Sequence, residues 1–90
     1  MASVNIPPSL RKLTGGKSRI KIEASSVEEL ILSMDERHPG IKQTILTETM
    51  QIRRFAMIFL NDEDIRYLDG LKTKLEDDSQ ISILMAVSGG

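Results

Sequence analysis

The sequence predicts an α+β fold, in which a mixed sheet of four to five strands carries one main helix across one face. Three observations predict it: short alternating apolar segments near both ends of the chain, one amphipathic segment between them, and an unbroken apolar run in the second half. Ninety residues suffice for one modest hydrophobic core. We therefore expect residues 1–90 to form a single domain.

The first part of the chain indicates a β-hairpin. Residues 4–6 alternate between apolar and polar side chains, and Pro7-Pro8 then ends the strand. Residues 14–17, Thr-Gly-Gly-Lys, are a turn signal, and alternation resumes at residues 20–22. We expect two short, half-buried strands joined by a somewhat long, mobile loop.

The main helix is predicted to start at Ser26 and to end near Arg37. Ser26 and Glu29 have capping-box spacing, so the Ser26 hydroxyl is expected to accept from the Glu29 amide and the Glu29 side chain to reach back to the Ser26 amide. Pro39-Gly40 stops the helix. Residues 41–46 suggest a short extra turn or a loop over the core. The apolar positions on one helical face are Val27, Leu30, Ile31 and Met34.

Two more strands are predicted in the second half. Residues 55–60, Phe-Ala-Met-Ile-Phe-Leu, favour a strand by their length and polar boundaries. Residues 61–66 are turn-like, residues 76–79 form a tight acidic turn, and residues 81–84 alternate as a last strand. A hairpin, a crossing helix and two further strands make the β-grasp arrangement of ubiquitin.

Composition excludes several classes of function. The net charge of −1, from 12 basic and 13 acidic side chains, provides no electrostatic basis for binding nucleic acid. The absence of cysteine excludes disulfides, thiol nucleophiles and cysteine zinc sites, and it fits a reducing cytoplasm. A single histidine excludes a multi-histidine metal site, and no apolar segment has the length of a membrane span or a signal peptide. We expect a cytoplasmic protein that binds no metal, cofactor, nucleic acid or membrane.

Three motif-like features are interpreted as structural. Residues 16–18, Gly-Lys-Ser, resemble the end of a phosphate-binding loop, but Arg11 stands where that motif needs glycine. Residues 62–64 are acidic like the start of a calcium loop, but Tyr67 occupies the required glycine position. His38, at the expected helix end, is interpreted as a capping or surface residue rather than a general base.

The terminal diglycine is the strongest candidate for chemistry. By itself the dipeptide is about equally compatible with a functional role and with an incidental one, as a flexible tail or a cloning scar. Its place beyond the last predicted strand favours a role, because glycine lets the backbone enter a narrow channel. The unhindered Gly90 carboxylate could attack the α-phosphate of ATP, which gives an acyl-adenylate open to sulfur or nitrogen nucleophiles. The catalyst would then be another protein. Residues 86–90 are predicted to form a flexible tail. We predict that the adenylate and the thiocarboxylate are formed at Gly90, and that the partner recognises the tail through Ala86, Val87, Ser88 and Gly89.

An apolar surface is predicted on the face of the sheet away from the helix. A sheet covered on one face should alternate between core and solvent, and Ala56, Ile58 and Leu60 suit the core. Their neighbours would point away, and such a patch on a small protein usually marks a partner surface. The alternative is that the loop of residues 41–50 or a neighbouring side chain covers part of it. The predicted docking patch consists of Phe55, Met57, Phe59 and Leu84.

Three segments resemble one known family. They are VNIP with LRKLTGG near the start, RRFAMIFLNDEDIRYLDGL in the middle and ISILMAVSGG at the end. With them, nearly the whole chain is similar to the ubiquitin-like sulfur carriers, which include the molybdopterin-synthase small subunit and the thiamine sulfur carrier. NDEDIR, at residues 61–66, is especially close to the branch that serves cysteine synthesis.

The resemblance implies a β-grasp carrier that is a co-substrate rather than an enzyme. A ubiquitin-activating-like adenylyltransferase and sulfurtransferase would use ATP to adenylate Gly90 and convert it to a thiocarboxylate. On the cysteine-synthesis branch, a pyridoxal-phosphate cysteine synthase would combine this sulfur with an activated serine, and a metalloprotease would release the cysteine. The cofactors would belong to those partners.

Three other functions stay open at this point. One is the small subunit of molybdopterin synthase. Another is a ubiquitin-like modifier joined to proteins through Gly90, which shares the activation step with a sulfur carrier. The third is a β-grasp interaction module whose glycines are incidental.

Overall fold

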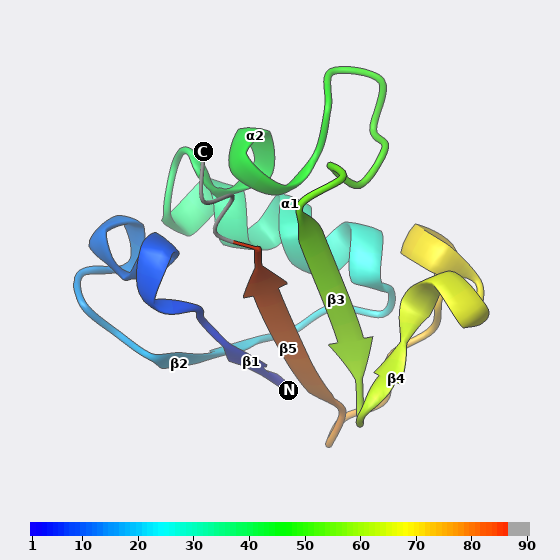
Figure 1. The fold of residues 1–90 in the computed structure, drawn as a ribbon. Helices are drawn as coiled ribbons and strands as arrows, with labels where there is room; N and C mark the ends of the chain where they lie inside the picture. The colour runs from blue at the N-terminus through cyan, green and yellow to red at the C-terminus, as the bar shows by residue number, and fades with distance from the viewer. Residues whose placement is uncertain (87–90) are drawn as a thin grey trace.

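The computed structural model describes residues 1–86, which form a mixed five-stranded sheet with helices packed across one face (Figure 1). This confirms the predicted α+β, β-grasp arrangement. The strands are β1 (Ala2–Asn5), β2 (Arg19–Ile22), β3 (Ala56–Leu60), β4 (Glu63–Asp64) and β5 (Gln80–Met85). The helices are α1 (Val27–Arg37), α2 (Ile41–Ile45) and three 3₁₀ segments, η1 (Pro8–Thr14), η2 (Ile65–Tyr67) and η3 (Gly70–Lys72).

The order of the strands is β2-β1-β5-β3-β4, so the last strand in sequence is the central one. β1 and β2 form the predicted antiparallel hairpin. β5 runs parallel to β1 and antiparallel to β3. The first half of β5 is thus paired on both sides, and its end, up to Met85, is paired with β3.

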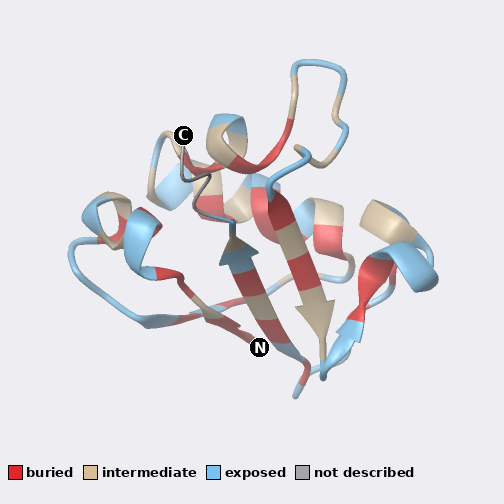
Figure 2. Ribbon diagram, viewed as in Figure 1, coloured by how far each residue is buried: buried red, intermediate tan, exposed pale blue. Residues whose placement is uncertain are grey.

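The core lies between the sheet and α1. All four residues of the predicted apolar helical face are buried, and so are Ile41, Ile45 and Leu46 of the predicted extra turn. Along β3 and β5, buried residues alternate with more exposed ones (Figure 2). Leu60 is only partly buried, although it packs against the core as predicted.

The structure confirms one of the two hydrogen bonds predicted for the cap of α1. The Ser26 hydroxyl accepts from the Glu29 amide at 3.1 Å. The return bond to the Ser26 amide is wrong, because the Glu29 carboxylate accepts instead from the Ser25 hydroxyl at 2.8 Å. Ser26 also forms an isolated β-bridge with Lys74, which ties the start of α1 to the segment after η3.

The hairpin connection differs from the expected mobile loop. Its first part is the 3₁₀ helix η1, which buries Leu10 in the core. The Thr14 hydroxyl then donates to the Lys17 carbonyl at 2.8 Å and closes the following turn. Gly15 and Gly16 have φ of 66° and 87° there, which glycine adopts without strain. β1 is also more buried than expected, since Ser3 is buried between β2 and β5.

No helix in the described part of the chain is long and apolar enough to cross a membrane.

Candidate functional site

The structure fixes the chain up to the end of β5. Met85 is paired with Ala56 of β3, and the Ala86 N–H donates to the Phe55 carbonyl at 2.7 Å. Of the predicted tail, Ala86 is exposed. It lies at the end of the sheet where β5 ends and β3 begins (Figure 1). The predicted residues Val87, Ser88, Gly89 and Gly90 lie outside the described residues.

A groove of about 430 Å³ lies beside this exit. Four segments that are distant in sequence build it: η1, α2, the turn before β3 and the end of β5. The side chains are mostly apolar, with one cation. The lining residues are Ser9, Leu10, Lys12, Leu13, Thr44, Phe55, Met85 and Ala86.

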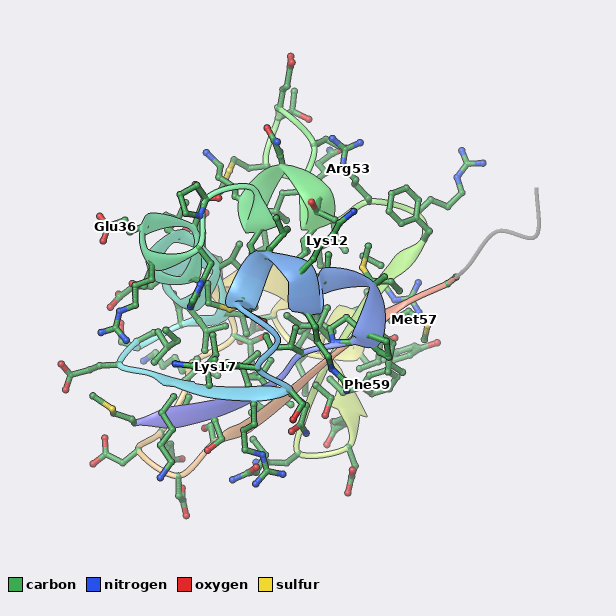
Figure 3. The ribbon with its side chains drawn as sticks, turned by 90° about the vertical axis from the view of Figure 1, so that its left-hand side faces the viewer. Lys12, Lys17, Glu36, Arg53, Met57 and Phe59 are labelled. Atoms are coloured by element: carbon green, nitrogen blue, oxygen red, sulfur yellow. The ribbon has the colours of Figure 1, made fainter. Side chains whose placement is uncertain are left out.

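The sheet brings three of the four predicted docking residues together. Met57 lies opposite Leu84, and Phe59 lies opposite Ser82 two pairs further along. Leu84 is 50% exposed, while Met57 and Phe59 are partly buried. Figure 3 shows Met57 and Phe59 on the side of the sheet away from α1. We call the surface made by Met57, Phe59 and Leu84 the outer patch; its docking role stays a prediction.

Phe55 does not belong to the paired part of β3. It lies in the turn before the strand, is 43% exposed and lines the groove with Met85 and Ala86. The unbroken apolar run suggested that the strand started one residue earlier. Of residues 41–50, Thr44 of α2 lines the groove together with Phe55.

Sequence reasoning missed the part of the groove that η1 contributes. Leu10 and Leu13 are three residues apart, and side chains at this spacing lie on the same side of a 3₁₀ helix. That spacing was the available signal, but the Pro-rich start and the glycines favoured a loop. Lys12 of η1 lines the groove, and Arg53 follows α2. Arg53 is held by its Nε donating to the Gln43 carbonyl at 2.9 Å.

The acidic segment next to β3 contains an ion pair between Asp64 and Arg66. Asn61 and Asp62, with φ of 48° and 82°, form the two-residue turn between β3 and β4. The Asp64 carboxylate accepts from Arg66 at 2.7 Å, and from the Arg66 backbone N–H at 2.9 Å. Hydrogen bonding to the Arg66 side chain lowers the pKa of Asp64. Residues 1–86 contain no cluster of three potential metal-ligating side chains.

Comparison with known proteins supports one family. The family model described as the ThiS family matches residues 4–90. The sulfur carrier protein CysO of Mycobacterium tuberculosis (strain ATCC 25618 / H37Rv) is 32% identical over 90 residues, which are 98% of this chain and 97% of the relative.

Solved structures agree with this match. A chain of the crystal structure of the Amycolatopsis orientalis BexX/CysO complex is similar with a TM-score of 0.93 and 37% identity, over 100% of both chains. The solution structure of small archaeal modifier protein 1 from Methanosarcina acetivorans is similar with a TM-score of 0.83 and 29% identity, over 99% of this chain and 95% of that one.

Proposed function

The chain belongs to the ThiS family, and on this basis we propose that it is a sulfur carrier protein that works through the carboxylate of Gly90. The observation that carries the proposal is the extent of the family match, which continues past β5 to residue 90. The Gly89-Gly90 pair thus falls inside the matched region.

The anchored strand supports a tail that is presented to another protein. Four residues follow Ala86, and four residues span at most about 14 Å when extended. The Ala86–Phe55 hydrogen bond fixes where this reach begins. A partner that holds the outer patch would therefore confine the Gly90 carboxylate to a small volume, which favours reaction.

The proposed chemistry takes place at the carboxyl carbon of Gly90. One carboxylate oxygen attacks the α-phosphorus of ATP, and pyrophosphate leaves. A hydrosulfide then attacks the acyl carbon of the adenylate, the bond to AMP breaks, and a thiocarboxylate and a proton result. Both steps need an adenylyltransferase and sulfurtransferase as partner, which supplies the catalytic groups.

We further propose that the sulfur is used to make cysteine. The resemblance of NDEDIR to the cysteine-synthesis branch and the similarity to CysO support this choice. The partners would be a pyridoxal-phosphate synthase that holds an activated serine and a metalloprotease that releases the product. Both cofactors, pyridoxal phosphate and the protease metal, would be bound by those partners.

The test is intact-mass spectrometry of the full chain after incubation with the activating enzyme, ATP and sulfide. We expect a gain equal to the difference between sulfur and oxygen, and no gain in a chain that lacks Gly90. Adding the synthase and an activated serine should then yield a carrier heavier by one cysteine residue. Thiolation of a molybdopterin precursor instead would show that the acceptor is wrong, while the carrier chemistry would stand.

One observation favours a second function. The similarity to small archaeal modifier protein 1 suggests a modifier, in which a lysine amine replaces the sulfur nucleophile. The same mass spectrum separates the two functions, because a modifier appears joined to other chains.

A further inference from the structure

The edge of the sheet formed by β2 has features that the sulfur-carrier function does not use. β2 is a terminal strand of the sheet, with β1 on one side only. It is separated from the central strand β5 by β1, so it lies away from the exit of the tail. Unpaired strand edges bind other extended chains readily.

The register of the hairpin exposes backbone groups on this edge. The Ile6 N–H donates to the Ser18 carbonyl at 2.8 Å, which sets the alternation of hydrogen-bonded pairs in the ladder. Arg19 and Lys21 then occupy the alternate positions, so their N–H and C=O groups face away from β1. An added strand would find two donors and two acceptors there.

A cleft of about 460 Å³ runs between this edge and the end of α1. β2 alternates between exposed and buried residues, with Arg19 and Lys21 exposed and Ile20 and Ile22 buried. Lys17 lies on the side of the molecule that faces the viewer in Figure 3. The lining residues are Lys17, Arg19, Ile20, Lys21, Ile22, Arg37 and His38.

The cleft is cationic, and the other edge of the sheet is not. Residues 1–22 contain five basic side chains and no acidic one, whereas residues 61–78, which include β4, contain seven acidic and three basic ones. Among residues 1–86 the ion pairs are Arg66–Asp64 and Lys72–Glu28, so no cation of the cleft is in an ion pair there. The free charges are therefore available to an incoming anionic group.

We propose that the β2 edge binds an extended acidic peptide segment of a partner protein as an additional strand. The peptide backbone pairs with Arg19 and Lys21, as in other cases of strand addition to a sheet edge. Side chains of an extended peptide alternate between two faces, and cations flank both faces of the edge. Carboxylates on one face meet Arg19 and Lys21, while apolar side chains on the other pack beside Ile20 near Arg37.

The probe is the peptide acetyl-Asp-Val-Asp-Val-Asp-Val-amide, titrated into the ¹⁵N-labelled full chain at low ionic strength. We expect the largest shifts at the amides of Arg19 and Lys21, slower hydrogen exchange of both, and weaker binding as salt rises. An Asn-for-Asp version should bind more weakly. A peptide N-methylated on alternate residues keeps the charges but cannot pair, and it should not bind.

Matched charge reversals test the site. Arg19→Glu should weaken binding by about three- to tenfold, because Arg19 meets the carboxylates of the peptide, while Arg54→Glu, the same change in the exposed turn before β3, should change it less than about twofold. Thermal melts of both variants control for folding. Equal binding of the N-methylated peptide, largest shifts at the outer patch, or no binding would overturn the proposal. If no peptide binds, the cations of β2 serve only to keep other chains from pairing with this edge. Self-association that gives the same shifts without peptide would also overturn it, because the occupant would then be a second copy.

Discussion

Met57 and Leu84 lie directly opposite each other on β3 and β5, on the face of the sheet away from α1. Leu84 is thus part of an apolar surface that ends two residues before Ala86. Its neighbour in sequence, Ile83, is 2% exposed and belongs to the core. A substitution at Leu84 therefore tests docking, whereas a substitution at its neighbour Ile83 tests folding.

Replacing Leu84 by arginine should weaken binding of the activating enzyme with little effect on stability. Full burial of a leucine contributes about 1.5–3 kcal/mol, and Leu84 is 50% exposed, so about half of this is available to a partner. We expect a loss of about 4- to 13-fold in affinity by calorimetric titration. Ile83→Asn is the control and should unfold the domain. Normal binding by Leu84→Arg would exclude the outer patch as the docking surface.

Removing Gly90, or adding one residue after it, should abolish adenylation without changing the thermal melt. The reason is that the reactive carboxylate is lost or displaced, while the core is formed by residues that precede the tail. ATP–pyrophosphate exchange with the activating enzyme measures the first effect. Exchange at the normal rate by the shortened chain would contradict the proposed attachment at Gly90.

Asp64→Asn should reduce the pH dependence of stability in acid. The folded pKa of Asp64 lies below its unfolded value, because Arg66 stabilises the carboxylate. This contribution is complete above the unfolded pKa of about 3.9, and it is lost as pH falls through the lower folded value. Urea unfolding at pH 7, 4 and 2.5 should therefore show a difference between wild type and variant that shrinks toward acid. Asp62→Asn, which breaks no ion pair among the described residues, is the control for the loss of a nearby carboxylate.

Ser26→Ala should lower the free energy of unfolding by about 1 kcal/mol, because the Glu29 amide loses its side-chain acceptor at the start of α1. Ser25→Ala removes only an exposed hydroxyl–carboxylate bond and should cost less. Urea denaturation of the two variants compares them. A larger loss for Ser25→Ala would mean that the bridge to the Glu29 side chain, and not the amide cap, holds the helix start.

Local patterns in the sequence predicted most of the secondary structure. The spacing of Val27, Leu30, Ile31 and Met34 depends only on the period of a helix, and the structure confirms it. The alternation around Ile81 and Ile83 depends likewise on the period of a strand. The failures occurred where a local signal had two solutions. The Glu29 carboxylate accepts a hydrogen bond from the Ser25 hydroxyl instead of from the Ser26 amide. The segment after Pro7 forms a 3₁₀ helix instead of a loop.

The class of fold, the family resemblance and Gly90 as the candidate group could be predicted from the residues alone, because each depends on residue types at short or terminal spacing. The surfaces that adjoin the end of β5 follow from the tertiary structure. The Met57–Leu84 pair and the groove bring together residues that are far apart in the chain. The free edge of β2 follows from the order of strands. Register and strand order are set by burying the whole apolar surface at once, and no single segment encodes them.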